Sequence, residues 1–115
     1  MEIANLQARI RRFRDERDWK QFHNHKDMAL GICVESAELL EHFQWLKGDE
    51  IDQRASEKRQ EITEEIADIL IYLLELADNL DVDLVKAVEQ KLAKNAAKYP
   101  VAKAKGSHKK YTELK

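Results

Sequence analysis

The sequence predicts an all-α protein, and three observations support that prediction. Only three glycines and one proline occur in 115 residues, so few positions interrupt a helix. Charged residues form 37% and hydrophobic residues 43% of the chain, as expected for helices that share a core and face solvent. Apolar residues also recur at intervals of three or four in several segments. We therefore expect one four-helix bundle-like domain over residues 1–115.

The first expected helix covers residues 2 to about 17. Its apolar stripe consists of Ile3, Leu6, Ile10 and Phe13. The segment RDWKQFHNHKD then breaks the periodicity, so we expect a connection whose side chains do more than fill a core. That connection carries Trp19, Phe22, His23 and His25.

Two long helices are expected next. The first runs from about Asp27, a plausible N-cap, to Gly48, which tolerates the positive φ that often ends a helix. The second covers about residues 52–80, and its middle, IADILIYLLELA, is apolar around most of its circumference. Such a helix is expected at the centre of a bundle.

The fourth expected helix begins after Asp81 or Asp83, runs to about Lys98 and ends before Pro100. The remaining tail, about residues 101–115, is basic, and we expect it to be irregular. A domain of this size leaves much of its surface unburied, so a dimer or a dimer of dimers is also expected.

Two pairs of acidic residues share one spacing. Glu35 and Glu38 lie three residues apart in one expected helix, and Glu65 and Asp68 repeat the spacing in the next. Each pair projects from one helix face, where like charges repel, and Asp68 adjoins an apolar run in which an unpaired carboxylate is costly. Carboxylates converging from neighbouring helices suit a hard cation such as Mg²⁺.

Paired acids on a helix surface are nevertheless common, and the Glu35/Glu38 pair alone is compatible with a solvated face. The further acids expected on the surface are Glu41, Glu61, Glu64 and Glu75, of which Glu61 and Glu64 could also face the site. A di-iron carboxylate bundle requires Glu-x-x-His on two helices, and this motif does not occur here.

Other polar residues allow more than one interpretation. Lys91, Asn95 and Lys98 form one face of the fourth helix, which could hold a triphosphate or simply be solvated. His23 and His25 are interpreted as ordinary surface residues rather than zinc ligands. Cys33 is expected to be a small buried hydrophobe rather than a nucleophile.

The acidic motifs also resemble those of a known family. VESAEL followed by EEIADILIYL matches the ExxE and ExxD motif pair of the MazG-like, all-α NTP pyrophosphohydrolases. Nearly the whole chain is similar to the dCTP pyrophosphatase branch of that superfamily. The segments that carry this similarity are ERDWKQFH, ELLEHFQW, EEIADILIYL, NAAKYP and KYTEL.

The resemblance implies Mg²⁺-dependent cleavage between the α and β phosphates of a nucleoside triphosphate, which releases the monophosphate and pyrophosphate. By motif, the metal ligands and catalytic residues are Glu35, Glu38, Glu65 and Asp68. Trp19 and Trp45 match tryptophans that surround the nucleoside, and Tyr72 matches a tyrosine near the sugar and phosphate. Core packing is the alternative role for these aromatic residues.

The resemblance makes dCTP or a modified dCTP the leading expected substrate, and nucleotide-pool house-cleaning the expected role. Related eukaryotic dCTP enzymes carry a histidine where this chain has Ile10, so the preferred base stays open. The implied partners are the nucleotide and further copies of the chain, as a homodimer or homotetramer.

Charge and hydropathy argue against other classes. The net charge of −2 gives no basic field for nucleic-acid polymers, and no apolar run is long enough to span a membrane. The single cysteine and the charged N-terminal segment favour a cytoplasmic chain used as written. The alternatives are a non-catalytic helical binding module and, more weakly, a nucleic-acid accessory protein using RIRRFR and KAKGSHKK.

Overall fold

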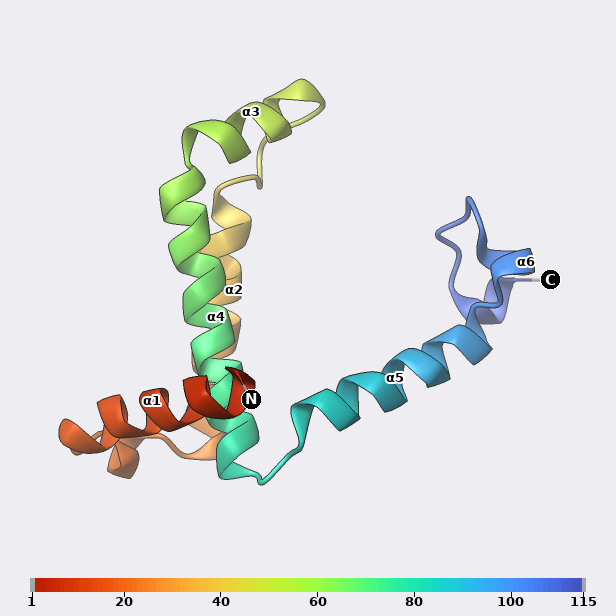
Figure 1. The fold of residues 1–115 in the computed structure, drawn as a ribbon. Helices are drawn as coiled ribbons and strands as arrows, with labels where there is room; N and C mark the ends of the chain where they lie inside the picture. The colour runs from red at the N-terminus through yellow and green to blue at the C-terminus, as the bar shows by residue number, and fades with distance from the viewer. Residues whose placement is uncertain (1, 115) are drawn as a thin grey trace. The chain divides into compact units, whose positions relative to one another are not determined.

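The computed structural model describes residues 2–114, and this part of the chain contains helices and no strand (Figure 1). The expected all-α class is confirmed. The elements are α1 (Glu2–Glu16), the 3₁₀-helix η1 (Lys20–Phe22), α2 (His25–Glu41), α3 (Asp49–Glu57), α4 (Arg59–Asn79), α5 (Leu84–Lys98), α6 (Val101–Ala104) and the 3₁₀-helix η2 (Tyr111–Glu113). None of the helices in these residues is long and apolar enough to cross a bilayer.

The described residues fall into two units that divide between Asp81 and Val82. In the first unit, α2 and α4 run antiparallel side by side, and α1 and α3 both pack on α4 (Figure 1). The long apolar helix is therefore at the centre of this unit, as expected. Met28 of α2 and Leu74 and Ala77 of α4 are the buried hydrophobic residues.

Helix α2 begins and ends earlier than expected. Its N-cap is Asn24, whose side chain accepts a hydrogen bond from the backbone N–H of Asp27 at 2.8 Å. The expected cap, Asp27, lies inside the first turn. The helix ends at Glu41 and turns follow, so Gly48 does not terminate it. Gly48 has a φ of +56° and serves instead as the N-cap of α3.

The prediction of a single helix over residues 52–80 is wrong, because α3 and α4 are separated at Lys58. This residue has φ −108° and ψ 27°, outside the helical region. The Arg54 side chain of α3 donates to the backbone carbonyl of His42 at 3.0 Å, which ties α3 to the turns after α2. No glycine or proline marks the break, so no local signal in the sequence predicts it.

The second unit contains α5, α6 and η2. The Asp83 side chain caps α5 by accepting from the backbone N–H of Lys86 at 3.1 Å. Pro100 ends α5 as expected, but the tail is not wholly irregular, because α6 and η2 form there. The ring of Tyr111 in η2 packs edge-on against Tyr99, with centroids 6.0 Å apart. That residues 1–115 form a single domain stays a prediction.

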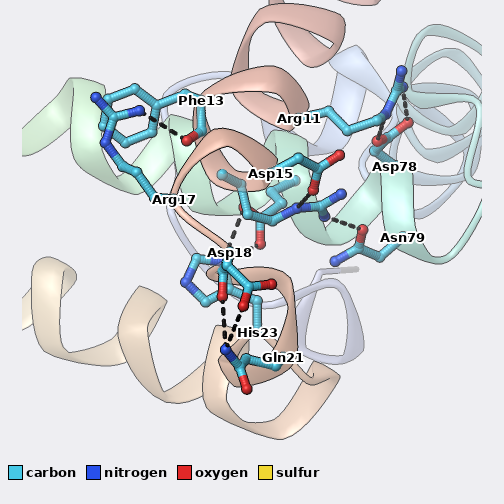
Figure 2. Close-up of polar contacts among 11 residues, drawn as sticks. Arg11, Phe13, Asp15, Arg17, Asp18, Gln21, His23, Asp78 and Asn79 are labelled. Carbon is cyan, nitrogen blue, oxygen red and sulfur yellow. Dashed lines mark hydrogen bonds and ion pairs between the residues drawn. The ribbon is translucent and has the colours of Figure 1, made fainter.

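The last turns of α4 hold α1 by polar contacts. Arg11 forms a bidentate ion pair with Asp78 at 2.8 and 2.9 Å, and Arg14 donates to Asn79 at 3.0 Å (Figure 2). Arg14 is only 3% exposed, and it lies four residues after Ile10 of the apolar stripe. Its second partner, Asp15, accepts at 2.9 Å. These contacts fix the end of α1 beside the end of α4.

Candidate functional site

Three of the four expected metal ligands lie together between the antiparallel helices α2 and α4. Carboxylate oxygens of Glu35 and Glu38 from α2 and of Glu65 from α4 lie within 4.8 Å of one another. All three residues are half-buried. Since each pair is spaced by three residues, both acids of a pair project from the same helix face. The local helix geometry thus brings acids that are far apart in sequence into one cluster.

The carboxylates of this cluster are not satisfied by the protein. One buried oxygen of Glu35 and one of Glu65 have no hydrogen-bond partner. The pKa of the Glu35 carboxyl is raised from 4.5 to about 7, first by burial and then by hydrogen bonding to the Glu65 and Glu38 carboxyls. Buried acids without a cation are costly, so the cluster fits a ligand set for a hard divalent metal.

Asp68 is exposed and lies beside this cluster rather than in it. It lines a cavity of about 300 Å³ together with Glu35, and its charge contributes to the raised pKa of Glu35. The structure therefore brings all four acids into one region. That Asp68 completes the metal shell stays a prediction.

The same cavity contains two of the expected aromatic residues, Trp19 and Tyr72, and also Ile10. The Trp19 ring packs edge-on against Phe13 at a centroid distance of 5.7 Å. Tyr72 lies against Gly31 of α2, where an added Cβ would be 3.2 Å from the ring. The absence of a side chain at position 31 thus allows the tyrosine ring to approach α2.

The other expected substrate contacts come from two further segments of the chain. Trp45 lies in the turns after α2 and is 84% exposed. Lys91, Asn95 and Lys98 belong to α5 in the second unit, where Lys98 lies over the Tyr111 ring at 4.7 Å. Their contact with a nucleotide stays a prediction.

Two residues of the cavity were misinterpreted from the sequence. Glu75 was expected on the surface, but it is 5% exposed. His23 was interpreted as an ordinary surface residue, but its Nδ1 lies 2.8 and 3.1 Å from the two Glu75 carboxylate oxygens. The position of Glu75 within the apolar run was the available signal, because an acid there needs a partner.

The remaining expectations have mixed outcomes. Cys33 is exposed, so its assignment as a buried hydrophobe is wrong. Glu41, Glu61 and Glu64 are exposed, as expected for surface acids. His25 is exposed and lines a second cavity of about 430 Å³, which it shares with His23.

Known proteins have sequences similar to this chain. The chain is 43% identical to dCTP pyrophosphatase 1 of Bos taurus and 41% identical to that of Homo sapiens. Both matches cover 98% of this chain, which spans 66% of the length of these curated relatives.

A solved structure is also similar to this chain. The crystal structure of a pyrophosphatase from Archaeoglobus fulgidus matches with a TM-score of 0.83 and 40% identity, covering 87% of this chain and 94% of that one. Residues 30–114 match the MazG-like family. This match includes all four acids of the site, and the chain belongs to the MazG-like family.

Proposed function

We propose that this chain is a Mg²⁺-dependent nucleoside triphosphate pyrophosphohydrolase that cleaves dCTP or a modified dCTP to the monophosphate and pyrophosphate. The observation that carries the proposal is the cluster of Glu35, Glu38 and Glu65, in which one buried oxygen of Glu35 and one of Glu65 lack protein partners. The pyrophosphatase names of the relatives support the reaction class. Nucleotide-pool sanitation in the cytoplasm is the role proposed for it.

The chemistry assigned to the acids follows from their surroundings. Bound Mg²⁺ would neutralise phosphate charge and make a coordinated water a better nucleophile. Glu35, Glu38 and Glu65 would hold the metal from two helices, while Asp68 would approach it from the more exposed side. The metal shell would keep positions open for phosphate oxygens and water.

The cavity beside the acids is suited to the nucleoside. Trp19 offers an indole face, and stacking of a base on an aromatic ring contributes about 1–3 kcal/mol. Tyr72 is one turn from Asp68 on α4 and lines the same cavity. Trp45 and the Lys91, Asn95 and Lys98 face are proposed as further contacts to base and triphosphate.

Self-association is proposed because apolar surface remains uncovered on the first unit. A groove of about 490 Å³ lies between α1 and α4, and its lining is almost entirely apolar. Phe13 and Leu70 of this groove are each about half exposed. Large exposed apolar patches mark interaction surfaces, and a dimer or a dimer of dimers would cover this one.

The test is a panel of common NTPs and dNTPs incubated with the purified protein in Mg²⁺ or in EDTA. Monophosphate, pyrophosphate and free phosphate are measured separately. We expect Mg²⁺-dependent release of pyrophosphate, with dCTP as the best of the unmodified substrates. No turnover of any nucleotide would support a non-catalytic binding module instead, and free phosphate without pyrophosphate would exclude the proposed bond.

A further inference from the structure

The pair formed by His23 and Glu75 is a largely buried ionisable contact of the cavity. The Glu75 side chain is 5% exposed and that of His23 is 22% exposed. Both carboxylate oxygens lie within hydrogen-bond distance of the same ring atom, Nδ1. An ionised carboxylate can only accept, so this contact is a hydrogen bond when the ring carries a proton on Nδ1.

The contact joins parts of the chain that are 52 residues apart. Glu75 belongs to the central helix α4, whereas His23 follows η1 in the connection between α1 and α2. That connection includes Asp18 in the left-handed region, with φ 55°. Trp19 lies in the same connection, and its ring centroid is 6.3 Å from that of His23. A bond that fixes His23 therefore also restrains the segment that carries Trp19.

Glu75 lies on the same face of α4 as the candidate catalytic residues. It follows Tyr72 by three residues and Asp68 by seven, which are one and two helical turns. His23 and Glu75 line the cavity that also contains Glu35 and Asp68. Among the described residues, the other ring nitrogen of His23, Nε2, makes no hydrogen bond.

We propose that Glu75 is a positioning residue, which fixes the His23 ring and the Arg17–Asn24 connection on the wall of the nucleotide cavity. Glu75 holds the proton on Nδ1, so that Nε2 keeps one defined role in the hydrogen bonding of the cavity. The second member of such a pair commonly sets the tautomer and orientation of an imidazole. This inference rests on the proposed function only in that the cavity binds a nucleotide.

The test uses Glu75→Leu, which removes the carboxylate while keeping a buried side chain of similar size. Removing one partner of a buried ion pair can destabilise a protein, so circular dichroism first checks that each variant keeps the helical fold. Glu75→Met is the second variant, and Glu75→Gln keeps an acceptor for Nδ1. Asp78→Asn is the matched control, because it breaks an ion pair one turn further along α4 without touching His23.

The first measurement is the tautomer of the four histidines, read by long-range ¹H–¹⁵N NMR, with His23 assigned from His23→Asn. We expect the Nδ1-protonated ring in the wild-type protein and in Asp78→Asn. In Glu75→Leu and Glu75→Met we expect the His23 signals to move to the Nε2–H tautomer that an unrestrained histidine side chain prefers. Unchanged His23 signals in both apolar variants would overturn the proposal.

The second measurement is nucleotide affinity. For Glu75→Leu we expect KM for dCTP to rise about tenfold with kcat changed less than twofold, whereas Glu75→Gln stays within about threefold of wild type. Calorimetric titration with α,β-methylene dCTP gives the same comparison without turnover. If the wild-type protein binds this analogue but hydrolyses nothing, the proposed function fails. The calorimetric comparison of Glu75→Leu with wild type still tests the positioning role. Equal affinity in Glu75→Leu and wild type would overturn that role.

Discussion

The acidic side chains of this chain differ more in their surroundings than in their type. Glu35 is half-buried beside two other carboxylates and has an unpartnered oxygen. Glu75 is buried but paired with His23, and Glu41 is exposed on α2. Burial without a basic partner distinguishes the acids suited to a metal from those that orient a neighbour or face solvent.

Glu38→Gln should abolish pyrophosphate release while the helical fold persists. The amide keeps the shape of the side chain but removes a charged ligand. Changes to groups that only support a metal ligand typically cost about 10–100-fold, so we expect a loss of at least about 100-fold in kcat/KM. The measurement is pyrophosphate release with dCTP, with helicity followed by circular dichroism.

The control for this substitution is Glu41→Gln, one turn further along α2 and exposed. It carries the same chemical change outside the cluster, and we expect activity within about twofold of wild type. Unimpaired turnover by Glu38→Gln would contradict the site assignment. Equal losses in both variants would point to a general effect on α2.

The raised pKa of Glu35 predicts a pH dependence of stability in the absence of metal. The folded protein holds this proton up to about pH 7, whereas the unfolded chain loses it near 4.5. The folded state therefore binds more protons in this window, and the free energy of unfolding falls as pH rises through it. In EDTA, the contribution of the Glu35 carboxyl to Tm should be greatest below pH 4.5 and should be lost above pH 7.

Differential scanning calorimetry from pH 5 to 8 measures this effect. Excess Mg²⁺ should raise Tm most at the upper end, where the carboxylates are ionised and the metal binds only the folded site. Glu35→Gln should flatten the pH dependence in EDTA, because the amide does not titrate. The prediction would be contradicted if the Tm in EDTA changed with pH to the same extent in Glu35→Gln and in the wild-type protein.

At the scale of elements, local capping fixes where two helices begin. Asn24 and Asp83 each accept a backbone N–H three residues on. Such a bond satisfies one of the free N–H groups at a helix start. The two caps set the register of α2, which carries Glu35, and of α5, which carries the proposed phosphate contacts.

Asn24→Ala should lower the free energy of unfolding by about 1 kcal/mol. Urea denaturation followed by circular dichroism measures this change. Asn24→Ser keeps a capping oxygen and should recover most of the loss. If alanine and serine behave alike, the side-chain cap does not contribute to stability.

The sequence predicted most elements because their signals are local. Spacings of three and four defined α1 and the apolar face of α4, and Asp83 and Pro100 marked the ends of α5. The break at Lys58 was missed, because its dihedral angles depart from the helix without glycine or proline. The tie between Arg54 and His42 is a tertiary contact, and helical periodicity contains no information about it.

At the scale of the whole molecule, the groove between α1 and α4 predicts self-association. Leu70→Glu places a charge in this groove, where the wild-type side chain is 48% exposed. We expect the mass measured by light scattering to fall to that of a smaller species, with helicity retained. Leu80→Glu is the control, because Leu80 is 49% exposed but does not line the groove. Equal masses for wild type and Leu70→Glu would exclude this surface as the interface.

The candidate site was only partly predictable for the same reason as the fold. A repeated spacing on two neighbouring helices predicted the four acids Glu35, Glu38, Glu65 and Asp68. The bond between His23 and Glu75, and the burial of Arg14 against Asn79, depend on residues more than 50 positions apart. No spacing within one segment encodes such contacts.

The central helix α4 also fixes the spacing of the residues around the site. Glu65, Asp68, Tyr72, Glu75 and Asp78 follow one another at steps of three or four along α4. An insertion of one residue after Tyr72 would rotate everything beyond it by about 100°. The metal-facing acids would keep their places, while Glu75 and Asp78 would turn away from the connection and from α1. Single-residue insertions and deletions in the middle of α4 should therefore be far less tolerated than substitutions on its outer face.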